Sequence, residues 1–340
     1  MHRQVLFIAL VAVLAAQCSS ALSRGLLQQQ CLRNGARCSL YQVGQCCAGT
    51  VCTMPLECTS RGSRSECLPE CRTQTLKNLT RVEFPSKFGM TPGFEGGKKN
   101  KPAVVVMQEW WGVNAAIRDI AMHVAEQGYR VLVPDLYRGR VAVDRMEAVG
   151  VRGTAAPLRT RPLTTCPPLH QPATPHPPRP RHRTRGVDDV VSAVQYLRAT
   201  GSKKVAILGF CQGGAMALCG AQFAGVDAAI PFYGIPGNFT GCDPVKIPKG
   251  VPIQAHYGTN DTSFPTSRVV PLYNAMTAAG VYAKLNLYEG LPHAFLNAIT
   301  PAGRVLFSNG NPVGFNFPSE KLVTQAFSRM TNFLRLHIRY

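Results

Sequence analysis

Cys211 lies in a sequence pattern typical of a catalytic nucleophile. The pentapeptide Gly-Phe-Cys-Gln-Gly (209–213) separates a run with strand character at 203–210 from a run with helix character at 213–225. In that context, flanking glycines let the backbone turn sharply, so that the nucleophile projects from the sheet edge. The positive end of the following helix favours a thiolate over a thiol. The pattern therefore predicts covalent catalysis by Cys211.

A base and an acid follow at the places where such a nucleophile needs them. Asp261 comes just after an expected strand at 252–257, and His293 comes just after another at 283–288. Either residue alone would be read as an ordinary polar group on a loop. Together with Cys211 they give the chain order nucleophile, acid, histidine, which is that of α/β hydrolases and differs from that of papain-like proteases. We therefore expect the three side chains to meet at one edge of a sheet.

Strands and helices alternate along the chain from residue 79 onward. Short apolar runs predict strands, and amphipathic or small-residue runs predict helices. Asn114 is placed to cap the first helix and Gly128 to end it, while Pro85 should close an edge strand. The alternation predicts an α/β fold with an open, mostly parallel sheet. The expected strands are 79–85, 101–112, 130–137, 203–210, 227–234, 251–258 and 283–290, and the expected helices are 113–129, 187–201, 213–225, 267–280 and 319–338.

Four segments resemble the dienelactone hydrolase family of α/β hydrolases. They are "VVVMQEWWGVNAAIRDIAMHVAEQGYRVLVPDLY", "LGFCQGGAMAL", "GTNDTSFP" and "LPHAFLN", and the resemblance covers about 103–139 and 186–297, and more loosely 79–102 and 298–337. The resemblance implies the α/β-hydrolase fold, hydrolysis of carboxylic esters or lactones, and a triad of Cys211, His293 and Asp261. It also implies that Glu109 contacts the resting thiol and helps to deprotonate it when substrate arrives.

Further site residues follow from the same resemblance. The backbone N–H groups of Gln212 and Trp110 are expected to hold the oxyanion, where one preformed donor contributes roughly 3–4 kcal/mol. Trp111 and Tyr233 are expected to line the substrate pocket, although core packing explains the two tryptophans equally well. Asn297 departs from the family, since bacterial members carry an arginine four residues after the histidine to bind a carboxylate. A neutral ester or lactone therefore fits better than an anionic dienelactone.

The beginning of the chain has the pattern of a secretory signal. A basic start is followed by an apolar run at 5–16, which is too short to span a bilayer, and then by small residues at 19–21. We therefore expect residues 1–21 to be removed and the protein to be secreted, with no stable membrane insertion afterwards. Three sequons, at Asn78, Asn238 and Asn260, would then be open to glycosylation.

A cysteine-rich module is expected at 22–72. Eight cysteines fall between Cys31 and Cys71, an even set that predicts a disulfide framework in an exported protein. The spacing resembles cystine-knot or hevein-like modules, which implies a weak polysaccharide contact, but Tyr41 is the only aromatic residue available for it. A stapled module with an unidentified ligand is therefore the preferred interpretation. It precedes an α/β domain that we place at 73–340.

The net charge of +19 does not predict nucleic-acid binding, because no helical face or RNA-binding motif gathers the charge. Part of it comes from residues 151–185, which hold seven arginines, nine prolines and no carboxylate. This composition cannot form a packed helix or a central strand. We therefore expect a disordered insert at about 150–186.

Two functions are compatible with these patterns. The first is a secreted hydrolase of carboxylic esters or lactones with a cysteine nucleophile, acting on a small-molecule substrate. The second is a secreted binding protein in which the cysteine-rich module is the active part and the hydrolase domain is weak or inactive. No HExxH, P-loop or GxGxxG pattern is present, so neither function is expected to need a metal or an organic cofactor.

Overall fold

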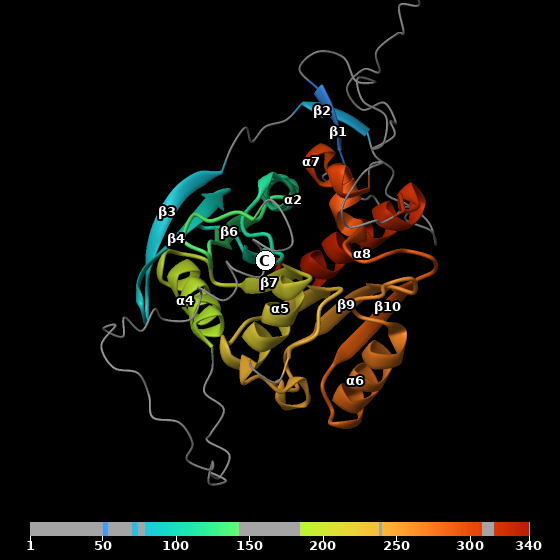
Figure 1. Cartoon of the computed structure of the whole chain (residues 1–340). Coiled ribbons are helices and arrows are strands. Elements are labelled where there is room, and N and C mark those ends of the chain that lie inside the picture. The colour runs from blue at the N-terminus through green and yellow to red at the C-terminus, as the bar shows by residue number, and fades with distance from the viewer. Residues whose placement is uncertain are drawn as a thin grey trace, which may run out of the picture.

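A twisted sheet, which comprises eight strands, forms the centre of the described part of the molecule (Figure 1). The computed structural model describes residues 50–53, 70–73, 79–142, 184–237, 240–307 and 316–339. In sheet order the strands are β10 (Ala283–Tyr288), β9 (Ile253–Gly258), β8 (Ala228–Phe232), β7 (Val205–Phe210), β5 (Ala103–Met107), β6 (Arg130–Pro134), β4 (Gly89–Gly96) and β3 (Thr80–Ser86). All pairings from β10 to β6 are parallel, and only the two pairings of β4 are antiparallel. The prediction of a mostly parallel sheet is confirmed.

The central strands are buried along their whole length. Every residue of β5, β6, β7, β8 and β9 is buried, as expected when helices cover both faces of a parallel sheet. Each fully buried Val, Leu or Ile side chain contributes about 1.5–3 kcal/mol relative to an exposed one. The aliphatic residues of these five strands therefore favour burial of both faces over exposure of either one.

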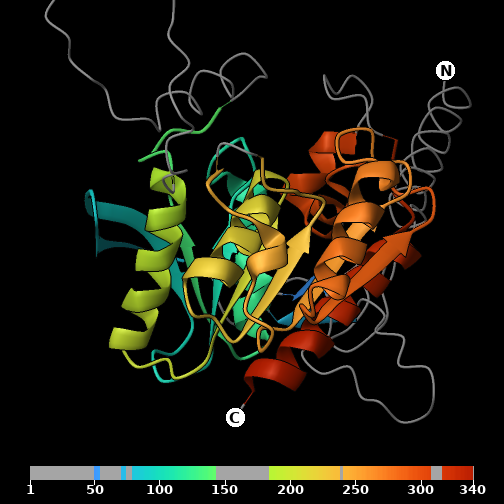
Figure 2. The ribbon, with the colours of Figure 1, turned by 90° about the horizontal axis from the view of Figure 1, so that it is seen from below.

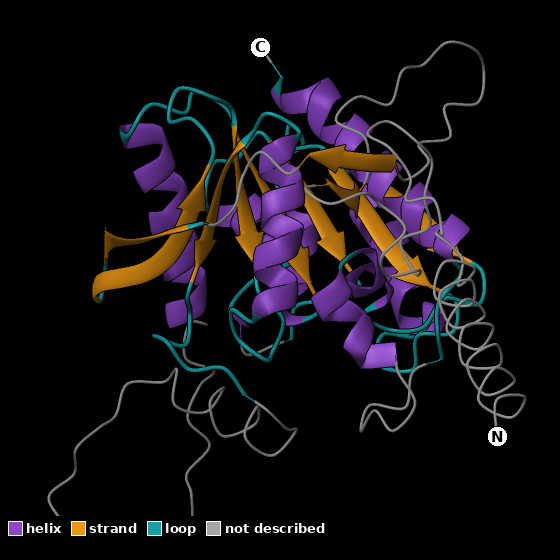
Figure 3. Cartoon of the chain, turned by 90° about the horizontal axis from the view of Figure 1, so that it is seen from above, coloured by secondary structure: helices purple, strands orange, loops and turns teal. Residues whose placement is uncertain are grey.

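Within the described residues, five longer helices cover the sheet in two layers (Figures 2 and 3). On one side lie α4 (Arg185–Ala199), α5 (Gln212–Phe223) and α6 (Thr266–Ala278), and on the other lie α2 (Ala115–Glu126) and α8 (Glu320–Ile338). Asn114 caps α2 as predicted, because its side chain accepts a hydrogen bond from the Ile117 N–H at 3.1 Å. The result is a helix–sheet–helix sandwich that fixes the strand ends from which the site residues emerge.

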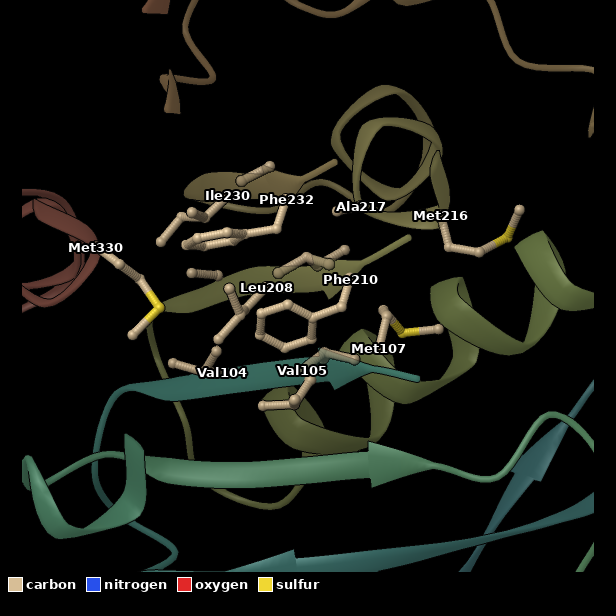
Figure 4. Close-up of a cluster of buried hydrophobic side chains, with 14 of the residues drawn as sticks. Val104, Val105, Met107, Leu208, Phe210, Met216, Ala217, Ile230, Phe232 and Met330 are labelled. Atoms are coloured by element: carbon tan, nitrogen blue, oxygen red, sulfur yellow. The ribbon is translucent and has the colours of Figure 1, made fainter. Parts of the chain in front are cut away.

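One continuous core joins sheet and helices. Side chains of β5, β7 and β8 gather with Met216 and Ala217 of α5 and with Met330 of α8 (Figure 4). Phe210 and Phe232, on neighbouring strands, have their ring centroids 5.4 Å apart. Phe210 directly precedes Cys211, so the base of the nucleophile turn is anchored in this core.

Several expected boundaries were wrong. β4 was not predicted, because its polar and glycine-rich residues carry no clear alternation. Pro85 lies inside β3 rather than ending it, which is tolerated because β3 is an edge strand with one unpaired side. β5 ends at Met107, five residues before the expected end of its strand.

The helical segments also differ in places. Arg185 and Gly186 form the start of α4, with Thr184 as its N-cap, rather than the end of the expected insert. Pro271 is accommodated within α6. Four short segments were not predicted: η2 (Pro244–Lys246), η3 (Phe295–Ile299), α7 (Pro301–Arg304) and η4 (Val305–Phe307).

Several predictions lie outside the described residues. They include the signal segment 1–21, most of the cysteine-rich module at 22–72, the greater part of the insert, and the sequons at Asn78 and Asn238. Within the module, β1 (Thr50–Thr53) and β2 (Glu70–Thr73) pair antiparallel, and their register sets Cys52 opposite Cys71. In the part of the chain that the structure describes, no helix combines the length and apolar character needed to cross a bilayer.

Candidate active site

Cys211 occupies a sharp turn between β7 and α5. Its backbone dihedrals are φ 54° and ψ −115°, a left-handed region that costs a non-glycine residue about 1–3 kcal/mol. The Cys211 N–H donates to the Phe232 carbonyl at 3.0 Å, and the Cys211 carbonyl accepts from the Ala215 N–H at 3.2 Å. Sheet and helix thus hold the strained residue from both ends, and strain of this kind is characteristic of functional sites.

The surrounding glycines are required by close backbone approach. A Cβ atom on Gly209 would overlap the Gly213 carbonyl, and one on Gly234 would overlap the carbonyl of Cys211. A Cβ atom on Gly213 would meet the Met107 carbonyl at the end of β5. The sequence pattern therefore has a steric cause: β5, β7, β8 and α5 converge around the nucleophile at distances that only glycine permits.

Asp261 and His293 form the expected acid–base pair. The Asp261 Oδ2 atom lies 2.8 Å from Nδ1 of His293, and both side chains are buried. The other oxygen, Oδ1, accepts the backbone N–H groups of Ser263 and Phe264 at 2.8 and 2.9 Å. The carboxylate is therefore locked in one orientation, with a single oxygen aimed at the imidazole.

His293 bridges the acid and the nucleophile. Its side chain hydrogen-bonds Cys211 as well as Asp261. Burial lowers the pKa of His293, but the charge of Cys211 and the bonds to Asp261 and Cys211 outweigh it and raise the pKa from 6.5 to about 10. With Nδ1 directed at Asp261, the remaining ring nitrogen, Nε2, is the one available to Cys211. The arrangement favours an imidazolium beside the cysteine sulfur.

Glu109 is buried near this relay, but its direct partner is Asn297. The Asn297 Nδ2 atom donates to Glu109 Oε1 at 2.8 Å and to the Ala294 carbonyl at 3.1 Å. Burial raises the pKa of Glu109, while the Asn297 bond and the nearby His293 lower it less. The structure thus places the Glu109 carboxyl against an amide, whereas Cys211 interacts with His293.

The two expected oxyanion donors belong to the start of α5 and to the turn after β5, two segments that approach each other where Gly213 lies against the Met107 and Gln108 carbonyls. As the first residue of α5, Gln212 has a backbone N–H without an intrahelical acceptor. Its side-chain Oε1 accepts the Tyr137 hydroxyl at 3.1 Å, which ties the residue to the loop after β6. Trp110 and Trp111 are half-buried, and their rings meet edge to face with centroids 4.9 Å apart.

Tyr233 is completely buried against the histidine. Its ring centroid lies 5.1 Å from that of His293 and 5.3 Å from that of Phe295, both in edge-to-face contact. The residue has a φ of 36°, the second strained position in this region. Tyr233 therefore buttresses the imidazole plane, while the half-exposed Trp111 remains the better placed of the two expected pocket residues.

Sequence reasoning missed two contributors to the site. Asn297 was noticed only for the charge it lacks, and Tyr137 was read as part of a strand. Both act through contacts with residues far away in the chain, 188 residues for Asn297–Glu109 and 75 for Tyr137–Gln212. Within the described ranges, no three His, Cys, Asp or Glu side chains cluster in a way that could hold a metal ion.

Comparison with known proteins assigns the chain to a family. The profile of the dienelactone hydrolase family matches residues 92–337, which include all four candidate catalytic residues. The chain belongs to this family, and its α/β-hydrolase fold follows from the strand order and from the position of the nucleophile turn.

Relatives in other organisms support the assignment. Protein usf of Aquifex pyrophilus is 31% identical over 64% of this chain and 86% of its own length. A putative carboxymethylenebutenolidase of Aquifex aeolicus is 31% identical over 58% of this chain and 77% of its own. The carboxymethylenebutenolidase of Pseudomonas putida is 31% identical over 44% of this chain and 56% of its own.

Solved structures agree on the fold. A putative dienelactone hydrolase from Klebsiella pneumoniae superposes with a TM-score of 0.57 at 21% identity, over 76% of this chain and 98% of that one. A dienelactone hydrolase-like promiscuous phosphotriesterase from metagenomic libraries superposes with the same TM-score at 17% identity, over 76% of this chain and 99% of its own. At these identities the likeness concerns the fold alone.

Proposed function

We propose that this protein hydrolyses carboxylic esters or lactones with Cys211 as the nucleophile, His293 as the base and Asp261 as the orienting acid. The observation that carries the proposal is the continuous relay from Asp261 Oδ2 through His293 to Cys211, set at a strained turn between β7 and α5. The family and the names of its curated relatives support ester or lactone bonds as the target.

The geometry supports the following acylation step. The Cys211 sulfur attacks the carbonyl carbon, while its proton resides on Nε2 of His293. The carbonyl oxygen becomes an oxyanion beside the backbone N–H groups of Gln212 and Trp110. When the tetrahedral intermediate collapses, the His293 imidazolium gives its proton to the leaving alkoxide. The products of this step are an alcohol and a thioester on Cys211.

Deacylation uses the same groups in the reverse sense. Neutral His293 removes a proton from water, and the hydroxide attacks the thioester carbonyl. Collapse of the second intermediate releases the carboxylic acid and returns the proton to the Cys211–His293 pair. Asp261 holds Nδ1 through its Oδ2 atom throughout, so that Nε2 alternates between base and acid.

The site favours a neutral substrate. Asn297, which occupies the position four residues after His293, is an uncharged amide already committed to Glu109. A carboxylate on the substrate would find no cation there and would face the buried Glu109 carboxyl. We therefore extend the proposal to uncharged short-chain esters and lactones.

We also propose that the chain is exported and that residues 1–21 are removed. The charge pattern, the short apolar run and the small residues before Leu22 support this. Amino-terminal sequencing of protein secreted by a eukaryotic host should begin close to Leu22. A mature protein that still starts at Met1 would contradict it.

Hydrolysis of a chromogenic short-chain ester by variants of the full chain tests the catalytic proposal. Cys211→Ser should keep the fold, because serine is similar in size, but its hydroxyl is much harder to ionise than a thiol. We expect a loss of activity of about a hundredfold or more. Cys211→Ala should lose at least as much, and circular dichroism should match that of the wild type.

The same assay separates the two functions weighed for this chain. Rates close to wild type in both Cys211 variants would remove the cysteine from the mechanism. Absence of activity in the wild-type protein over a panel of neutral esters and lactones would favour the alternative, a binding protein whose cysteine-rich module is the active part.

A further inference from the structure

Two cysteines outside the catalytic relay lie against each other. Of the cysteines in the described residues, Cys211, Cys219 and Cys242 are free thiols. Cys219 is fully buried on α5, whereas Cys242 is half-buried in the segment that leads from β8 to η2. Cys242 packs against the core cluster that contains Cys219, and the neighbouring Cys219 thiol is the largest influence on the pKa of Cys242, which it raises. Neighbouring thiols on two packed segments are the arrangement from which a disulfide, with its sulfur atoms about 2 Å apart, can form.

The backbone around Cys242 is independently fastened to the same face of α5. Gln222 follows Cys219 by three residues, so both project from one side of the helix. The Gln222 Oε1 atom accepts the backbone N–H of Asp243 at 2.8 Å, and the Cys242 N–H donates to Thr240 Oγ1 at 3.3 Å. The first bond holds the backbone next to Cys242 against α5, and the second fixes the turn that precedes it.

We propose that Cys219 and Cys242 form a disulfide in the exported protein, which latches the nucleophile helix α5 to the segment after β8. The closed ring comprises residues 219–242 and contains Tyr233 and Gly234, which contact His293 and the Cys211 backbone respectively. The latch therefore fixes the second half of α5 relative to the strand end that supports the imidazole. It also removes two thiols that would otherwise compete to pair with Cys211.

The oxidation is a thiol–disulfide exchange with a low-molecular-weight disulfide such as oxidised glutathione. The Cys242 thiolate attacks one sulfur of the donor, which gives a mixed disulfide and releases one thiolate. Cys219 then loses its proton and attacks the Cys242 sulfur, which releases the second thiolate. Two protein thiols are oxidised by two electrons, and one donor disulfide is reduced to two thiols.

The folded, reduced protein should form this bond slowly. Contact with the Cys219 thiol and burial both raise the pKa of Cys242, so little thiolate is present at neutral pH. Cys219 is fully covered. The bond is therefore expected to form during folding, before the pair is enclosed, and afterwards to resist reduction.

Differential alkylation of the full chain refolded in a glutathione redox buffer tests the proposal. Free thiols are blocked with iodoacetamide after unfolding without reductant, and the remaining cysteines are then reduced, labelled with a heavier reagent and mapped by mass spectrometry. We expect the heavy label on Cys219 and Cys242 and the light label on Cys211. In Cys242→Ser, Cys219 should take the light label.

Thermal unfolding supplies a second readout. Because a disulfide that closes a ring of this length stabilises the folded state by about 3 kcal/mol, the oxidised wild type should melt about 10 °C above Cys242→Ser. This difference in melting temperature should disappear when a reductant is added, because the reductant breaks the crosslink. A difference caused by packing at the substituted residue would persist in the reductant. Cys166→Ser, a matched loss of one cysteine, should leave the labelling of Cys219 unchanged. Light label on Cys219 in the unreduced wild type, or a melting gap that survives reduction, would overturn the proposal.

Discussion

Replacing Asp261 with asparagine should damage this site more than the small change in shape suggests. Two backbone N–H groups, those of Ser263 and Phe264, point at Oδ1. An asparagine in this place must turn its carbonyl oxygen toward them, since its amide nitrogen cannot accept hydrogen bonds. Its amide N–H₂ then occupies the position of Oδ2, which is 2.8 Å from Nδ1 of His293.

The imidazole tautomer follows from that orientation. An amide donor at Nδ1 requires an unprotonated Nδ1, so the single proton of neutral His293 moves to Nε2. That nitrogen faces Cys211 and can no longer accept its proton. The variant thereby loses the base itself as well as a negative charge.

The size of the effect can be worked from the histidine. A rise in the pKa of His293 from 6.5 to about 10 corresponds to about 5 kcal/mol in favour of the imidazolium, shared between Cys211 and Asp261. If about half of this is lost and the wrong tautomer adds to it, the barrier rises by about 4 kcal/mol, or about 10³-fold in kcat/KM. General-base effects of about 10²–10⁴ bracket this value.

The assay compares Asp261→Asn with Asp261→Ala on the same chromogenic ester. The alanine variant leaves room for water and imposes no tautomer, so it should retain more activity than the asparagine variant. The pH dependence of Cys211 alkylation reports whether the imidazolium beside it has been lost. Asp261→Asn within tenfold of wild type, or clearly above Asp261→Ala, would refute the reasoning about the carboxylate orientation.

Two further predictions concern buried polar groups. Asn297→Leu should lower the free energy of unfolding by about 1–3 kcal/mol, because it leaves Glu109 Oε1 buried without a donor. In urea unfolding, the double variant Asn297→Leu with Glu109→Leu should recover most of this lost stability. A double variant whose loss equals the sum of the two single losses would contradict the prediction. His256 is fully buried between Tyr288 and Gln254, and burial holds its pKa well below 6.5. Below pH 6.5, His256 is therefore protonated in the unfolded chain but stays neutral in the folded one. The free energy of unfolding should fall as the pH drops below 6.5, by up to about 1.4 kcal/mol per pH unit. Urea unfolding between pH 6.5 and 5.5 should show this slope, and His256→Gln should flatten it; an unchanged slope would exclude His256 as its source.

Chain order and local composition carried most of the information about fold class. Buried strands such as β5 and β7 are short aliphatic runs, and helices such as α2 and α8 show a 3.6-residue period, so both could be predicted without tertiary contacts. β4 could not, because what makes it a strand is pairing with β3 and β6 rather than its own residues. Tertiary pairing decides such strands.

The catalytic relay was predictable from sequence for a related reason. In a parallel sheet, the carboxyl ends of all strands meet at one edge, so residues that follow successive strands are brought together whatever the details of packing. Cys211, Asp261 and His293 each follow such a strand, and their order along the chain already determines which can be nucleophile, acid and base. The glycines around Cys211 similarly predict the turn, because only glycine permits the backbones to approach so closely.

Only the tertiary structure decided how the remaining groups are paired. An amide, a hydroxyl or a thiol has no preferred partner encoded in its neighbours along the chain, because hydrogen bonds between side chains depend on which surfaces fold against each other. From the sequence, Asn297 therefore indicated only that the arginine of related proteins is absent, and its hydrogen bond to Glu109 could not be predicted. Likewise, Cys219 and Cys242 are unremarkable in sequence, and the packing of the segment after β8 against α5 is what makes them a pair.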